Sequence, residues 1–146
     1  MVIKPISLYL VEEFWIVTFN GIPLFSYSPE KDLNSSLISS FFSAIQGFSN
    51  QMDGKHNRYI NSLTVGDSVF NFVINREYEL YFISKSSERI ESKLINRHLK
   101  EIQEMFISRF KGDLKNFMGE VTRFEEFTPI FENYFQDKFV KLKSMW

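Results

Sequence analysis

Apolar residues recur along this chain with two different periods, and each change of period marks a change between strand and helix. The runs Phe14–Phe19 and Ile22–Tyr27 are rich in aromatic and β-branched residues, and Asn20-Gly21 separates them. Asn-Gly favours the type I′ turn of a β-hairpin, so this region is predicted to form two antiparallel strands. The preceding run, Ile6–Val11, either extends the first strand or forms a separate lead-in.

The first predicted helix follows Ser28-Pro29, where the spacing of apolar residues changes to three and four. Its expected buried stripe consists of Leu33, Leu37, Phe41, Ala44, Ile45, Phe48 and Met52, and it is widened by Ile38 and Phe42. The opposite face is polar but uncharged, and it carries Ser35, Ser36, Ser39, Ser43 and Gln46. Because an exposed helix normally carries charged residues, we expect this helix to be covered on two sides.

Three further strands and a long helix are predicted after this helix. Period two and short connections indicate an antiparallel meander of strands at Tyr59–Val65, Ser68–Asn75 and Tyr78–Ser84. Helical spacing returns over Ser87–Phe110, with one apolar stripe and charged residues elsewhere. Gly112-Asp113 is expected to close this helix.

The last predicted helix lies near the C-terminus. Thr122 and Glu125 are spaced as in a capping box, but Pro129 fits only a first turn, so the regular helix is expected to begin near Thr128. The order of elements is therefore β-β-α-β-β-β-α-α. It predicts an α+β fold with α/β/α layers, in which helices cover both faces of one five-stranded antiparallel sheet.

The composition is that of one folded domain, which we expect to span residues 1–146. Hydrophobic residues make up 44% of the chain and include 17 Phe, which excludes a disordered protein. Seventeen basic and eighteen acidic residues leave a net charge of −1, so no global field favours nucleic acid or an anionic membrane. Cys is absent, which excludes disulfides, thiolate metal sites and cysteine nucleophiles.

Residues with catalytic or ligand-binding chemistry do not form a recognisable motif. His56 and His98 lack the paired His or Cys of a metal site, and the six glycines are isolated, so neither common phosphate-binding loop can be built. The pairs Glu12-Glu13 and Glu125-Glu126 are expected to be solvated charges, since neighbours in sequence point apart. We therefore predict no catalytic, cofactor-binding or metal-binding residues, and no enzyme activity.

No targeting or membrane-spanning segment is expected. The N-terminal stretch Met1–Leu10 has no small-residue cleavage site. The longest uncharged stretch, Leu33–Met52, is about half polar, which is too polar for a lipid-embedded helix. A soluble, cytoplasmic protein is therefore expected.

The order of the elements and several local sequences resemble the longin-domain family. Residues 14–25 (FWIVTFNGIPLF) resemble a longin opening hairpin, with an apolar strand, an Asn-Gly turn and a second strand that contains Pro-Leu-Phe. Part of the first predicted helix resembles the buried face of the first longin helix, at Leu37, Phe41, Ala44, Ile45 and Phe48. The C-terminal part resembles the end of the second longin helix and the third longin helix, at Phe106, Phe110, Gly112-Asp113, Phe124, Phe127, Ile130 and Phe131. The resemblance covers about residues 14–139 and implies a longin/profilin-like fold.

The resemblance implies a non-enzymatic interaction module of membrane-trafficking machinery. Longin domains bind other proteins, often another longin domain or a small GTPase, so the implied partners are a small GTPase and/or a longin or roadblock protein, in a homo- or heterodimer. No nucleic acid is implied, and membrane association is expected only through partners. The chain ends at Trp146 without the heptad segment or anchor of SNARE longin proteins, so it resembles a stand-alone longin protein. Its Ile-, Asn-, Lys- and Phe-rich usage suits an AT-rich genome and favours an archaeal source.

The surfaces expected to bind such partners are the edge strand of the sheet and the uncharged face of the first helix. An uncharged face loses little solvation free energy when a partner covers it. The predicted partner-binding residues are therefore Ser35, Ser39, Ser43 and Gln46. Two alternatives remain open: a PAS- or profilin-like domain whose aromatic residues enclose a small ligand, and a small hydrolase with a deep polar pocket around His56 or His98.

Overall fold

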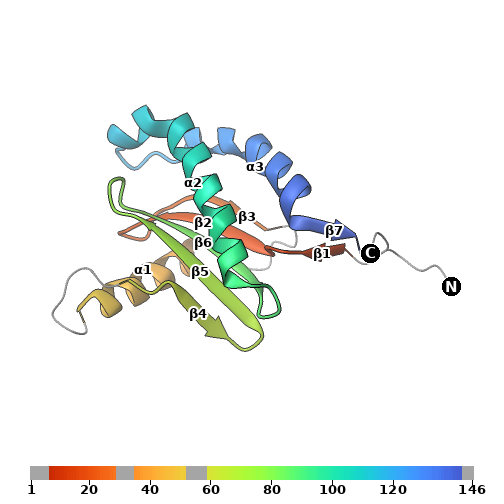
Figure 1. The fold of residues 1–146 in the computed structure, drawn as a ribbon. Coiled ribbons are helices and arrows are strands. Elements are labelled where there is room, and N and C mark those ends of the chain that lie inside the picture. The colour runs from red at the N-terminus through yellow and green to blue at the C-terminus, as the bar shows by residue number, and fades with distance from the viewer. Residues whose placement is uncertain (1–6, 29–34, 52–58, 143–146) are drawn as a thin grey trace.

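Five strands form one antiparallel sheet in the order β3-β2-β6-β5-β4 (Figure 1). The computed structural model describes residues 7–28, 35–51 and 59–142, with the backbone alone for 7–9, 35–37 and 141–142. The strands are β2 (Glu13–Thr18), β3 (Pro23–Tyr27), β4 (Ser62–Val65), β5 (Ser68–Asn75) and β6 (Leu80–Ser87). The five-stranded antiparallel sheet predicted from the sequence is confirmed.

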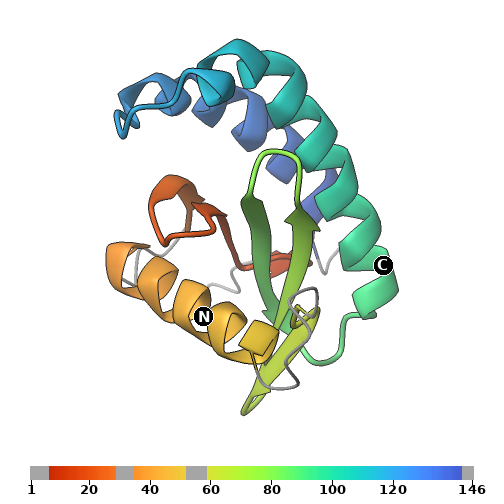
Figure 2. The ribbon, with the colours of Figure 1, turned by 90° about the vertical axis from the view of Figure 1, so that its left-hand side faces the viewer.

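Helices cover both faces of this sheet, as Figure 2 shows. Helix α1 (Ser35–Gln51) lies on one face, whereas α2 (Ser92–Lys115) and α3 (Thr128–Tyr134) lie on the other. A 3₁₀-helix, η1 (Thr122–Phe127), leads into α3, and a π-helical turn, η2 (Phe135–Phe139), follows it. The predicted α+β order and its layers are therefore confirmed.

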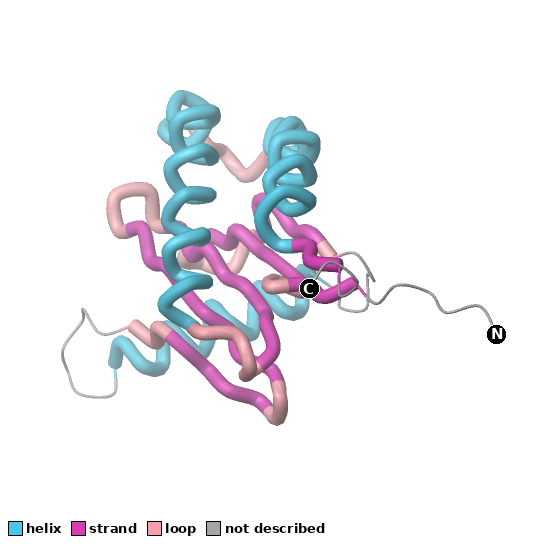
Figure 3. The backbone as a smooth tube through the Cα atoms, turned by 45° about the vertical axis from the view of Figure 1, so that its right-hand side comes forward, coloured by secondary structure: helices cyan, strands magenta, loops and turns pink. Residues whose placement is uncertain are grey.

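Two short strands pair outside the main sheet. Strand β1 (Ser7–Tyr9) is antiparallel to β7 (Val140–Leu142), and the two lie side by side in Figure 3. The pairing continues beyond the strands, because Leu10 N–H donates to Phe139 O at 2.7 Å. Of the two possibilities for the N-terminal run, the separate strand is correct.

Each central strand contributes to two cores, because successive residues point to opposite faces of a sheet. On β2, Phe14 and Ile16 face α2 and α3, whereas Trp15 and Val17 face α1. We call these the large core and the small core. Among the described residues, seventeen hydrophobic residues are buried in the large core and six in the small core.

The β2–β3 hairpin forms where the sequence predicts it, but with a different turn. Gly21 has a φ of +92°, whereas Asn20 does not have a positive φ. Gly21 N–H donates to Thr18 O, and Thr18 N–H donates to Ile22 O, both at 2.9 Å. This is a three-residue loop with Gly in the left-handed position, accompanied by a register shift next to Val17. The predicted two-residue type I′ turn is therefore wrong.

Strand β4 begins at Ser62 rather than at Tyr59. The reason is a side chain of α1: the amide group of Gln46 hydrogen-bonds both backbone groups of Ile60. The segment before Asn61 is thereby tied to α1 instead of to β5.

Strand β6 begins at Leu80 rather than at Tyr78 for a related reason. Asn75 Oδ1 accepts a hydrogen bond from Tyr78 N–H at 2.8 Å, and Glu79 has a φ of +54°, which is uncommon for a residue with a Cβ. The side chain of Asn75 thereby lengthens the turn between β5 and β6.

The two C-terminal helices differ from the prediction at their ends. Helix α2 continues through Gly112, and its backbone is non-helical at Phe110 (φ −119°, ψ 17°), which marks a kink. The predicted capping box is wrong, because Thr122 Oγ1 donates to the Glu120 carboxylate and no side chain caps η1. The regular helix begins at Thr128, as the sequence predicts.

Candidate functional site: the surface of helix α1

Polar side chains hold helix α1 against the sheet. Gln46 is fully buried, and its Nε2 donates to Ile60 O at 2.8 Å while Ile60 N–H donates to Oε1 at 2.7 Å. Ser43 Oγ donates to Phe19 O at 2.6 Å. Each bond satisfies a backbone group that the sheet leaves unpaired, and a buried backbone group without a partner would be costly. The polar side chains of α1 therefore attach the helix to the rest of the domain.

Small residues let α1 approach the sheet closely. A Cβ atom placed on Gly21, in the β2–β3 loop, would lie 3.5 Å from Ser43 Cβ and 3.6 Å from Ser40 Cα. Between these small residues, Phe42 is 1% exposed and packs edge-on against Trp15, with ring centroids 5.7 Å apart. One large side chain and several small ones thus make up the inner face of the helix.

The inner face of α1 agrees only in part with the sequence prediction, since Phe42 is buried as expected but other members of the stripe are not. Phe41 is 52% exposed and Phe48 is 70% exposed, and Ala44 between them is also exposed. These residues were expected in the buried stripe, so that prediction is wrong for all three. Periodicity identifies two stripes on this helix, but both are uncharged, and it does not tell which stripe faces the sheet.

The predicted partner-binding residues lie mostly on the inner face. Ser39 and Gln46 are 0% exposed. Ser43, which donates a hydrogen bond to Phe19 O, is half-buried. Ser35 begins α1, and its side chain lies outside the described residues. The outward orientation on which the prediction rested is therefore wrong for Ser39 and Gln46.

The exposed face of α1 is uncharged and carries two Phe side chains. We call it the α1 surface, and it consists of Ser40, Phe41, Ala44, Gly47 and Phe48. These positions are three and four apart, so they lie along one side of the helix. Helix α1 contains no charged residue. Burying a Phe side chain gains about 1.5–3 kcal/mol, so a partner covering both exposed rings would gain free energy from each.

The other large hydrophobic residues exposed in the described chain are Val65, Met118 and Ile130. Each lies on a different element from the others and from α1. Single exposed apolar side chains are common on protein surfaces, whereas an aligned pair of Phe is not. The α1 surface is therefore the strongest candidate for an interaction site.

His98 belongs to a hydrogen-bonded chain between α2 and α3. Its Nδ1 lies 2.7 Å from the Tyr134 hydroxyl oxygen, and that hydroxyl donates to Glu101 Oε2 at 2.6 Å. The burial of Tyr134 and its bond to Glu101 raise the pKa of the phenol above its usual value. The half-buried His98 thus joins α2 to α3 through Tyr134, while His56 lies outside the described residues.

Each of the two carboxylate pairs contributes to ion pairs. Lys85 Nζ is 3.5 Å from Glu13 Oε2 and 4.0 Å from Glu12 Oε2, and Glu13 is only 6% exposed. The prediction of a solvated charge is therefore wrong for Glu13. In the other pair, Glu126 is exposed and its Oε2 lies 3.5 Å from Arg109 Nη2.

Within residues 7–28, 35–51 and 59–142, no group of three His, Asp or Glu side chains is placed to hold a metal ion. Within the same ranges, each helix is too short or too polar to cross a bilayer.

Aromatic rings in the large core pack on one another. Phe131 stacks on Phe14 with centroids 4.7 Å apart, and Phe106 lies 4.9 Å from Phe110 and 5.1 Å from Phe127. Rings at these separations are in mutual contact. The abundance of Phe therefore contributes to packing, and these rings give no support to the alternative of an aromatic-lined ligand cavity.

Comparison with known proteins agrees with this architecture. The family model described as "First Longin domain of FUZ, MON1 and HPS1" matches residues 12–120, which include the five-stranded sheet, α1 and α2. Among solved structures, Myxococcus xanthus MglB is similar, with a TM-score of 0.51 and 14% sequence identity over 67% of this chain and 85% of that chain. At this identity the likeness shows the fold alone. No curated protein matches the sequence.

Proposed function

Since this chain belongs to the family of first longin domains of FUZ, MON1 and HPS1, we propose that it is a non-enzymatic interaction module of the membrane-trafficking type. It forms one longin-like domain over residues 1–146 and acts in the cytoplasm. Its partners are proteins of the kinds that longin domains bind, a second longin or roadblock domain or a small GTPase.

The exposed α1 surface carries this proposal. Phe41 and Phe48 lie two turns apart, about 10 Å along the helix axis at ~1.5 Å per residue. Between and beside them are the small residues Ser40, Ala44 and Gly47. A partner helix that packs against the α1 surface meets two anchoring rings and no charged group of α1.

We assign the α1 surface to a second longin domain, in the same chain type or in a partner subunit. Charged residues are absent from all of α1, so two such helices can pack without like-charge repulsion and without desolvating a charge. A small GTPase would then bind elsewhere on the domain or on the dimer that the two domains form.

The test measures assembly of the purified protein with purified candidates. Light scattering after size-exclusion chromatography gives the mass of the protein alone and mixed with longin or roadblock proteins of the source genome. Small GTPases, loaded with GDP or a GTP analogue, are tested in the same way. A dimer or a complex with one of these proteins is expected.

Paired substitutions distinguish the α1 surface from other contacts. Phe41→Ser with Phe48→Ser is expected to weaken longin pairing at least tenfold, while the control Met118→Ser leaves it unchanged, since Met118 is 95% exposed and remote in sequence. A strict monomer that binds none of the candidates would contradict the proposed function. Pairing that survives the double substitution would contradict the role of the α1 surface but not the proposed function as a whole.

A further inference from the structure

The charged residues of this domain are distributed unevenly among its helices. Helix α2 carries six basic and three acidic residues, whereas α1 carries no charge. The segment from η1 to η2, residues 122–139, carries two basic and four acidic residues. The small net charge of the chain, −1, therefore conceals a local excess of positive charge on α2.

Most of the basic residues of α2 lie in one row along its outer side. Their spacings are four, three, eleven and four residues, and each is close to a whole number of turns of an α-helix. All of them are exposed, while the buried residues of α2 lie on the opposite side. We call this set the basic row, and it consists of Lys93, Arg97, Lys100, Lys111 and Lys115.

The basic row continues across the kink of α2. The backbone is non-helical at Phe110, whose side chain is buried, and Lys111 and Lys115 beyond it are exposed. Figure 2 shows that α2 arches around the large core, so its outer side is convex and turned to the solvent. From Lys93 to Lys115 the row follows the helix for about 33 Å at ~1.5 Å per residue.

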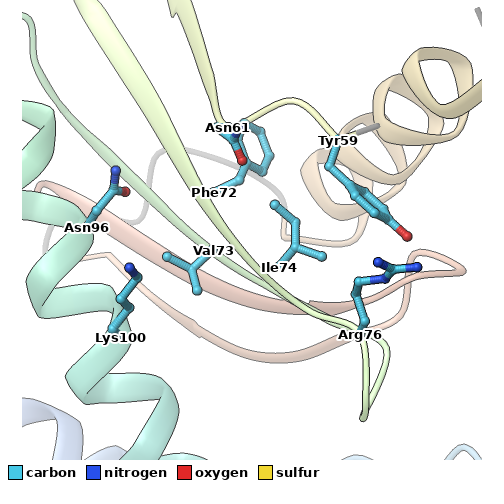
Figure 4. Close-up of a pocket in the computed structure, with 8 residues that line it drawn as sticks. All are labelled: Tyr59, Asn61, Phe72, Val73, Ile74, Arg76, Asn96 and Lys100. Carbon is cyan, nitrogen blue, oxygen red and sulfur yellow. The ribbon is translucent and has the colours of Figure 1, made fainter. Parts of the chain in front are cut away.

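The cations of the basic row are not neutralised by the domain itself. Within residues 7–28, 35–51 and 59–142, none of the five side chains has an ion pair or a hydrogen bond. Glu101 follows Arg97 by one turn, but its carboxylate accepts a hydrogen bond from Tyr134. Figure 4 shows Lys100 beside Asn96 on α2, with its side chain extended away from the helix.

This arrangement costs helix stability. Lys93 and Arg97 are four residues apart, as are Lys111 and Lys115, and like charges at this spacing destabilise a helix. Glu104 is the one carboxylate among the exposed residues on this side of α2. A local arrangement that lowers stability, with no compensating contact in the described chain, is typical of a functional surface.

The composition of the basic row favours a lipid bilayer as its ligand. Tight protein interfaces depend on apolar or aromatic anchors, and none of the large hydrophobic residues exposed in the described chain lies on α2. Single-stranded nucleic acid is bound through aromatic side chains among the cations, and the aromatic residues of α2 are buried. A cluster of about four to eight Lys or Arg on an amphipathic helix needs no such anchor to bind anionic lipid headgroups.

We propose that the basic row docks this domain on a membrane that contains anionic phospholipids. The acidic excess on residues 122–139 is repelled by such a surface, which favours an orientation with α2 toward the lipid. Helix α1 covers the other face of the sheet, so the α1 surface stays accessible in the docked protein (Figure 2). The inference does not depend on the α1 surface or on the proposed function.

The test is sedimentation of the whole purified chain with lipid vesicles. One set of vesicles is pure phosphatidylcholine, and the other contains about 30% phosphatidylserine. At about 0.1 M salt, binding to the anionic vesicles is expected to be at least tenfold tighter. At about 0.5 M salt most of this difference should disappear, because salt screens exposed charges. Equal binding to both kinds of vesicle would overturn the proposal.

Matched charge reversals test whether the basic row is the contact. Arg97→Glu with Lys100→Glu is expected to weaken binding to the anionic vesicles at least tenfold. The control, Arg123→Glu with Lys138→Glu, changes the net charge by the same amount at two cations that lie in ion pairs outside the row. Its expected loss is less than threefold, and circular dichroism verifies that both variants fold. Equal losses would overturn the assignment to the basic row.

Soluble polyanions distinguish a bilayer from other acidic ligands. A single-stranded RNA, a DNA duplex and polyglutamate are each titrated in the same buffer, and at least tenfold weaker binding than to the anionic vesicles is expected. Tighter binding to any of the three would overturn the assignment to a membrane. Full competition by inorganic phosphate at constant ionic strength would overturn it as well.

Discussion

The two faces of the sheet are covered to different degrees. The face under α2 and α3 buries seventeen hydrophobic residues of the described chain, ten of them Phe, whereas the face under α1 buries six. The first face is closed by amphipathic helices with charged outer sides. The second is closed by one uncharged helix that turns two Phe side chains to the outside.

This difference separates the face that contributes most to the stability of the domain from the face that we propose to bind a partner. The large core is a dense set of ring contacts, so it is expected to provide most of the free energy of folding. The small core is held by Phe42 together with the polar bonds of Gln46 and Ser43. Because Phe41 and Phe48 of α1 do not pack in the core, their side chains can contact a partner.

The largest expected effect comes from opening the large core. Phe131→Ala removes a ring that stacks on Phe14 and lies 5.4 Å from Phe25, so the free energy of unfolding is expected to fall by about 3–5 kcal/mol. Urea denaturation followed by circular dichroism measures the change. Ile130→Ala is the matched control on the same helix, with an expected loss below about 1 kcal/mol, since Ile130 is 37% exposed. Equal losses for Phe131→Ala and Ile130→Ala would contradict the conclusion that the large core provides most of the free energy of folding.

The next effect tests how α1 is attached. Gln46→Ala leaves the N–H and C=O of Ile60 without partners, so a loss of about 1–3 kcal/mol is expected. Hydrogen exchange at Ile60 should become faster, while the exposed control Ser40→Ala should change neither quantity. If Gln46→Ala instead abolished partner binding at unchanged stability, the partner-binding role predicted from the sequence would be right.

A smaller effect concerns the contact between α2 and α3. Tyr134→Phe removes the hydroxyl that bridges His98 and Glu101, with an expected loss of about 0.5–1.5 kcal/mol at neutral pH. The loss is measured by urea denaturation. A variant as stable as the wild type would show that the bridge contributes nothing.

The same variant has a defined pH dependence. The pKa of Tyr134 is raised by burial and then by Glu101, so the folded protein holds the phenolic proton more tightly than the unfolded chain does. The stabilisation is therefore fully present below pH ~10, the unfolded pKa, and is lost as pH rises through the folded pKa. Burial raises the pKa of Tyr81 to about 12, which affects both proteins alike. The stability gap between wild type and Tyr134→Phe should shrink above pH ~10, and a constant gap would contradict this.

The smallest expected effect on folding comes from the α1 surface. Phe48→Ser removes a ring that is 70% exposed, so the free energy of unfolding should change by less than about 0.5 kcal/mol. The control is Phe42→Ser, at a position that is 1% exposed and expected to be strongly destabilising. Similar losses for both would mean that the outer face of α1 is covered within the domain itself.

The sequence by itself determined the order of the elements and the nature of the sheet. Alternation along Ser68–Asn75 predicted β5 with its observed bounds, and the change of period predicted α1 and α2. These predictions succeed because periodicity is local: it depends on which residues stand two or four positions apart.

Tertiary structure alone decided which stripe of α1 faces inward and where the proposed α1 surface lies. Ser43 and Gln46 bond to Phe19 and Ile60 across the fold, and Phe42 packs in the small core on the same side of the helix. A hydrogen bond between residues distant in sequence leaves no periodic signal, because its partners meet only after the chain has folded.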